Sequence, residues 1–189
     1  MRRICISLIL VFTICLGLSS CSRQAVRITR TEALPIQYII DGINKNDPET
    51  YRKAFPPDYN SAIEGEEAMW KYEDSTVYSD YDSYLKPILA LSKNTRLENY
   101  GKRNGIEYIV EDVKPIEFTD YPQYFEKYDD LYVYSYDIDP VEIQKAAMVK
   151  GKLNVWGSKK EETKTAEFVV ICINGVWYLH PVYYYTSLS

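Results

Sequence analysis

The apolar positions in the first third of the chain repeat every three or four residues. After Leu34 the stripe consists of the isoleucines Ile36, Ile39, Ile40 and Ile43. A repeat of this period predicts a helix with one buried face. Asp47 and Pro48 have the residue types of an N-cap and a first helical position, so a second, short helix is expected, ending at Pro56.

Two further helices are expected before the pattern changes. Asp58 is placed to cap a third helix, and residues 73–82 are polar and predict a loop. A fourth helix is expected over residues 83–99, with Gly101 placed to end it in a left-handed conformation. The apolar side of that helix consists of Leu85, Ile88 and Leu89.

After Gly105 the apolar period changes from 3.6 to 2. Alternation over residues 106–111 predicts a strand, and Thr119–Tyr128 predicts a helix. Residues 141–156 predict a long strand with one buried face, from which Lys150, Lys152 and Asn154 point away. The buried face is expected to carry Ile143, Ala147, Val149, Leu153 and Val155.

The strongest local pattern lies near the end of the chain. Two strand-like runs, 163–173 and 176–182, are separated by Asn174-Gly175, a pair that favours a type I′ turn. This turn predicts the pairs Ile173–Val176, Cys172–Trp177, Val170–Leu179 and Phe168–Pro181. Both faces of the hairpin are apolar, so one should pack on the helices. The other must be covered by more chain, a partner or a ligand.

The order of these elements predicts an α+β fold, in which N-terminal helices pack on a curved antiparallel sheet with a closing hairpin at 163–182. Tyr100-Gly101 before a strand and the ending Asn-Gly-Val-Trp-Tyr-Leu resemble small lipoproteins of Gram-positive bacteria. Val176 stands where those proteins usually have Lys. The resemblance covers residues 34–183 and implies a cystatin-like cone, similar to the nuclear transport factor family. This cone hosts isomerases, dehydratases and binding modules, so it does not select a function.

The N-terminus has the pattern of an export signal. Two arginines precede an apolar stretch from Ile4 to Leu18, which is too short for a comfortable membrane span. The sequence Leu18-Ser19-Ser20-Cys21 looks like a bacterial lipobox. The resemblance implies a diacylglyceryl group on the sulfur of Cys21 and cleavage before it. An ordinary signal peptide or an uncleaved anchor is the alternative.

These features predict a signal peptide over residues 1–20, a tether over 21–33 and one domain over 34–189. The expected location is the cell membrane, lipid-anchored and facing outside the cytoplasm. Composition agrees, because 189 residues suit one domain, and 27 acidic against 22 basic residues disfavour a nucleic-acid partner. After processing and lipidation only Cys172 remains as a free thiol, so no disulfide is expected.

No motif in the sequence identifies a catalytic residue. The single histidine, His180, is directed away from Cys172 by the hairpin register, so a structural role at a strand end is expected. Acidic pairs recur without the remaining ligands of a calcium loop, and solvated loop acids are expected rather than a cation site. The pairs are Asp80 with Asp82, Asp129 with Asp130, and Asp137 with Asp139. No metal and no cofactor are predicted.

The 19 tyrosines suggest a binding surface. Tyrosine rings provide rigid contact area for proteins or glycans, although packing on the sheet edge would also explain them. The candidate binding face consists of Tyr132, Tyr134, Tyr136, Tyr183, Tyr184 and Tyr185.

The expected function is therefore a membrane-anchored extracytoplasmic binding module for an envelope protein or glycan, with a second copy at the sheet face as a further candidate partner. The alternatives are a small-molecule isomerase or hydrolase with a pocket between sheet and helices, and a structural factor that self-associates.

Overall fold

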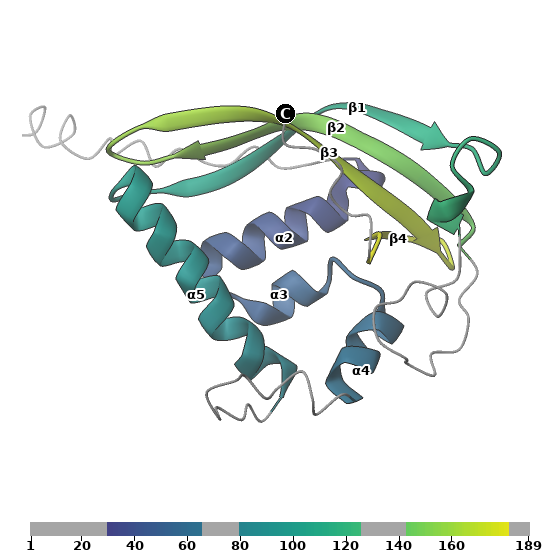
Figure 1. The fold of residues 1–189 in the computed structure, drawn as a ribbon, viewed down its shortest axis with the longest axis horizontal. Helices are drawn as coiled ribbons and strands as arrows, with labels where there is room; N and C mark the ends of the chain where they lie inside the picture. Colours follow the sequence, from purple (N-terminus) through teal and green to yellow (C-terminus); the bar gives the residue numbers. More distant parts are fainter. Residues whose placement is uncertain (1–29, 66–79, 126–142, 182–189) are drawn as a thin grey trace, which may run out of the picture.

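The computed structural model describes residues 30–65, 80–125 and 143–181, which form a helical layer and one antiparallel sheet (Figure 1). The helical elements are η1 (Thr31–Ala33), α2 (Leu34–Lys45), α3 (Pro48–Arg52), α4 (Pro57–Gly65), α5 (Tyr81–Tyr100) and η3 (Pro122–Phe125). The strands are β1 (Gly105–Ile116), β2 (Lys145–Trp156), β3 (Glu161–Ile173) and β4 (Val176–Leu179). The predicted α+β class, with its helices before the closing hairpin, is confirmed.

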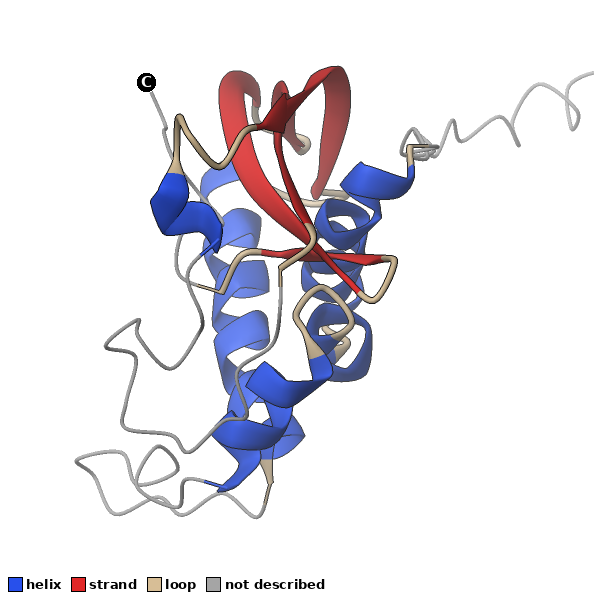
Figure 2. Ribbon diagram, turned by 90° about the vertical axis from the view of Figure 1, so that its right-hand side faces the viewer, coloured by secondary structure: helices blue, strands red, loops and turns tan. Residues whose placement is uncertain are grey.

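The sheet has the strand order β1-β2-β3-β4, and every neighbouring pair is antiparallel. It arches over α2 and α3, while α5 descends from one end of the arch (Figure 1). Seen from the side, the strands curve around the top of the helical layer (Figure 2). A curved sheet cradling helices is the cone architecture expected from the sequence.

Helices α3 and α5 begin at aspartates that cap them. The Asp47 carboxylate accepts from the Thr50 N–H at 3.2 Å, and the Asp80 carboxylate accepts from the Ser83 N–H at 2.7 Å. The prediction that Asp58 caps the third helix is wrong, because α4 already begins at Pro57. Proline lacks the N–H that a cap would satisfy, and it suits the first helical position.

Helix α5 differs from its prediction at one apolar position. It begins at Tyr81, two residues early, and Gly101 ends it with a φ of 86°. Leu85 and Leu89 are buried as expected, whereas Ile88 is 41% exposed and does not join them. Helical spacing alone placed Ile88 on the buried side. The surface of α5 that contacts the rest of the domain is narrower than the predicted apolar side, and Ile88 lies outside it.

The closing hairpin confirms the predicted turn and register. Asn174 and Gly175 have φ values of 51° and 79°, as a type I′ turn requires. The pairs Ile173–Val176, Cys172–Trp177 and Val170–Leu179 are present. The second strand ends earlier than predicted, at Leu179, because Pro181 has no N–H for the ladder.

Two other predicted boundaries are corrected. The long strand begins at Lys145, and Ile143 lies before it. In place of a helix beginning at Thr119, the described residues show a turn followed by the single 3-10 turn η3, which starts at Pro122. Asn154 points away from the helices as predicted but is buried, where it donates to Glu107 Oε1 at 3.1 Å.

Tyr108 lies at the centre of the core between the sheet and the helices. Its ring meets Phe168 edge-on at 5.1 Å, and its hydroxyl lies 3.0 Å from the Val149 carbonyl and 2.9 Å from the Ala166 carbonyl. The buried residues around it come from the helical layer and from β2, β3 and β4. They are Ala33, Ile36, Ile39, Ile40, Ala54, Phe55, Ala147, Val149, Ala166, Phe168, Val170 and Leu179.

A second core covers the other face of the hairpin. Tyr124 of η3 and Ile143 pack there against Val169, Ile171 and Ile173. The sequence left open whether further chain, a partner or a ligand covers this face, and in the structure further residues of the chain cover it. Farther along the same face the sheet becomes polar, as the Lys150–Glu167 ion pair of 3.2 Å shows.

The packed domain begins slightly before the predicted end of the tether. Thr31–Ala33 form η1, and Ala33 is fully buried in the first core. The small methyl side chain of Ala33 fits against the sheet, and sequence periodicity gave no sign of it. Among the described helices, none is long and apolar enough to cross a membrane.

A candidate binding groove

Several residues singled out by the sequence lie outside the described ranges. They are Cys21, Tyr132, Tyr134, Tyr136, Tyr183, Tyr184 and Tyr185, together with the acidic pairs at 129–130 and 137–139. Lipid attachment at Cys21 and the tyrosine binding face therefore stay predictions.

The acidic pair within the described chain is accessible to solvent, as predicted, and it also has a structural role. Asp80 caps α5, and Asp82 pairs with Arg52 at 3.0 Å. This ion pair joins α3 to the first turn of α5. No cluster of three or more potential metal ligands occurs in residues 30–65, 80–125 and 143–181.

His180 is fully buried immediately after β4, as a structural strand-end histidine would be. Its ring lies 6.1 Å from that of Tyr124, in the second core. Burial lowers the pKa of His180 from 6.5 to about 4, so the imidazole is neutral at pH 7. The Cys172 thiol donates to Gln144 Oε1 at 3.9 Å. These positions do not form a cysteine–histidine site.

One groove, with a lining of aromatic, aliphatic and charged side chains, lies where η1, the end of β1, the start of β2 and the hairpin meet. Its volume is about 530 Å³. The lining residues are Arg30, Glu32, Val113, Pro115, Ile116, Glu117, Phe118, Phe125, Gln144, Lys145, Ala146, Ala147 and Trp177. We call this surface the η1 groove.

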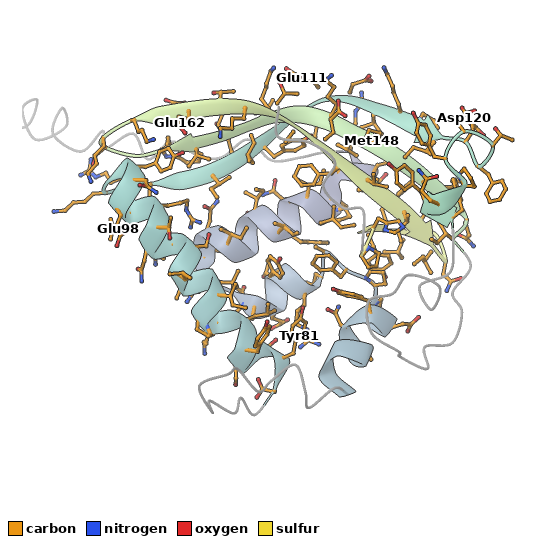
Figure 3. All side chains as sticks on the ribbon, in the orientation of Figure 1. Tyr81, Glu98, Glu111, Asp120, Met148 and Glu162 are labelled. Carbon is orange, nitrogen blue, oxygen red and sulfur yellow. The ribbon has the colours of Figure 1, made fainter. Side chains whose placement is uncertain are left out.

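Aromatic side chains give the η1 groove an apolar wall. Phe118 is 61% exposed and meets Phe125 edge-on at 5.6 Å. The neighbouring Tyr121 is also exposed and stacks on Tyr124 at 5.6 Å. Asp120, labelled in Figure 3, marks the turn that carries these rings beyond the end of β1. Exposed aromatic rings held against one another are typical of recognition surfaces.

The same groove contains charges of both signs. Arg30 and Lys145 supply the cations, and Glu32 and Glu117 supply the anions. Gln144 is held in place because its Oε1 accepts from the Gly175 N–H at 3.1 Å. Among the described lining residues there is no serine, threonine, cysteine, histidine or tyrosine. The groove is therefore equipped for binding and offers no ordinary hydroxyl or thiol nucleophile.

Sequence reasoning missed this groove for an identifiable reason. Interpreting Thr119–Tyr128 as a helix placed Tyr121 on a helical face and left Phe118 just before the helix. The signal that could have corrected this is Pro115 and Pro122, which bracket the two aromatic residues. Proline-bounded aromatic segments favour an irregular exposed turn over a helix interior.

Large buried side chains lie between the sheet and the helices in the described residues. Tyr108, Phe168 and Ile36 are three of them. The alternative of an enzyme with a pocket between sheet and helices stays a prediction.

Comparison with known proteins gives little further information. No protein-family model matches the chain, and no curated protein matches it. A solved structure described as an NTF-2-like protein of unknown function from Shewanella oneidensis MR-1 aligns with a TM-score of 0.35 and 13% identity. The alignment covers 78% of this chain and 90% of that one. The fold described above rests on the helices and strands of this chain.

Proposed function

We propose that this protein is a lipid-anchored extracytoplasmic binding module, and that the η1 groove holds a segment of an envelope protein. The observation that carries the proposal is the position of the groove at Arg30. Arg30 follows the proposed lipid-bearing Cys21 by nine residues, which extend to about 30 Å at most. A partner in the groove would therefore be held close to the membrane surface.

The chemistry of the groove favours a protein segment over a glycan. Phe118, Phe125 and Trp177 offer apolar and aromatic contact, while Lys145 and Glu117 offer charges of opposite sign. A polypeptide can match all of these groups, whereas a neutral glycan leaves the charges without partners. The lining of the η1 groove, in which no described side chain carries a hydroxyl or thiol group, favours binding over the enzyme alternative.

Lipidation is the first testable part of this proposal. In protein isolated from its native membrane, mass spectrometry should find Cys21 as the N-terminal residue with a diacylglyceryl group on its sulfur. Cys21→Ser should leave an unlipidated precursor, because serine has no thiol to acylate. An unmodified Cys21 in the wild-type protein would overturn the proposed anchoring.

Partner binding is the second part. A photo-crosslinking residue placed at Tyr121 should capture one partner in native membranes, and Phe118→Ser should reduce the yield about tenfold, since aromatic anchors dominate many interfaces. Leu97→Ser is the matched control, because Leu97 is also exposed but lies on α5, outside the η1 groove. Equal yields in the two variants would show that the groove does not bind the partner.

A further inference from the structure

A second groove runs along α5 and is independent of the proposed function. It has a volume of about 530 Å³ and lies between α5 and the sheet residues Ile106 and Val155. Its lining on the helix follows one face for three turns, consisting of Ile88, Leu91, Ser92, Thr95, Arg96, Asn99 and Tyr100. Leu91 is 67% exposed, so much of the apolar surface of the groove near Leu91 is accessible to solvent. We call it the α5 groove.

The α5 groove contains a buried cation. Arg96 is only 6% exposed, and its guanidinium donates to Ser92 Oγ at 2.9 Å and to the Ile43 carbonyl at 3.2 Å. Both partners are neutral. In the described part of the chain, Arg96 forms no ion pair, and its Nε has no hydrogen-bond partner. Two of its five N–H groups are therefore used, and three remain.

The partners of Arg96 differ from those of Arg52. Arg52, which is more exposed, has the Asp82 carboxylate as its partner. For Arg96, the Ile43 carbonyl belongs to the last turn of α2, whose partial negative charge offsets only part of a full positive charge. Burial lowers the pKa of Arg96, as expected for a guanidinium without a counter-ion. The site is thus complementary to an anion.

We propose that the α5 groove binds a single-chain aliphatic carboxylate, with its head group at Arg96 and its chain along Leu91 and Ile88. Guanidinium groups bind carboxylates through two parallel hydrogen bonds, and the remaining N–H groups on Nη1 and Nη2 suit that geometry. From Arg96 to Ile88 the helix rises about 12 Å, which gives an aliphatic chain an apolar path. Glu98, labelled in Figure 3, marks the turn of α5 just after this head-group site.

The direct test is titration of the full chain, carrying Cys21→Ser, with dodecanoate below its micelle concentration, followed by calorimetry. The substitution ensures that no attached acyl chain competes. We expect saturable one-to-one binding, with at least tenfold weaker binding of dodecanol and of dodecyltrimethylammonium. Absence of dodecanoate binding, or equal binding of dodecanol, would overturn the proposal.

Variants on α5 locate the site. Leu91→Asp should weaken dodecanoate binding at least tenfold, because it places an anion beside the chain and opposite Arg96. Leu97→Asp, at a position that is 47% exposed and does not line the groove, should change it less than twofold. Equal effects of the two variants would place the ligand elsewhere and refute the assignment.

The role of Arg96 itself needs a readout beyond folding, because the side chain also joins α5 to α2. Arg96→Gln should weaken dodecanoate binding at least tenfold while leaving the much weaker dodecanol binding unchanged. Loss of both in parallel would indicate a structural role alone. Sedimentation of the same protein measures its oligomeric state. A dimer that takes up no dodecanoate would indicate that a second copy covers the groove at Leu91, which would also refute the proposal.

Discussion

Gly151→Ala should lower the free energy of unfolding by about 3 kcal/mol or more, which is severe for the addition of one methyl group. A Cβ at this position would lie 2.2 Å from the Ile109 carbonyl oxygen and 2.7 Å from Cζ of Tyr108. Neither neighbour can retreat, because Ile109 lies in β1 and Tyr108 is fixed at the centre of the core. Urea denaturation monitored by circular dichroism measures the change.

The matched control for this substitution is Gly175→Ala. Nothing lies within 4 Å of a Cβ built at Gly175, but its φ of 79° is unfavourable for alanine. The cost there should be only about 1 kcal/mol, from backbone strain alone. If the two variants lose equal stability, Tyr108 does not pack across Gly151 as described.

His180 should make the domain less stable as the pH falls below 6.5. The unfolded chain binds a proton near pH 6.5, whereas the buried imidazole has a pKa of about 4. The contribution of the neutral His180 to the free energy of unfolding is therefore fully present above pH 6.5, and it is progressively lost as the pH falls to 4. The difference of about 2.5 pKa units corresponds to about 3 kcal/mol.

The measurement compares the loss of unfolding free energy between pH 7 and pH 4 in the wild type and in His180→Gln. The variant should be less stable at pH 7, since it places an amide in the second core. Its loss of unfolding free energy between the two pH values should nevertheless be smaller by about 3 kcal/mol. The two proteins have the same carboxylates and differ only in the imidazole. Identical losses would mean that His180 is accessible to protons in the folded state.

Local patterns in the sequence were sufficient for the hairpin and for most helices. Asn174-Gly175 determines its turn from two residues, and Asp47-Pro48 determines a helix start in the same way. Such features depend on neighbouring residues alone, so an isolated sequence contains them. The period-2 pattern likewise identified the strand that carries Tyr108.

The grooves could not be predicted because each is assembled from segments distant in sequence. Phe118 and Trp177 line one groove only after the sheet has formed, and Arg96 of α5 reaches the Ile43 carbonyl of α2. Exposure of Ile88 likewise depends on how far α5 lies from the sheet, which helical spacing does not encode. Tertiary packing decides these features.

The hydrogen bond from the Leu179 N–H to the Ala54 carbonyl, 2.8 Å long, ties the last strand to the loop between α3 and α4. These residues are separated by more than half of the chain, and Ile36 and Phe55 of the helical layer share their core with Leu179 of β4. A ribosome-bound chain cannot complete this layer until β4 has emerged, so native folding must await nearly the whole polypeptide. If the protein is exported as proposed, the late closing strand would leave the nascent chain unfolded until its synthesis is nearly complete.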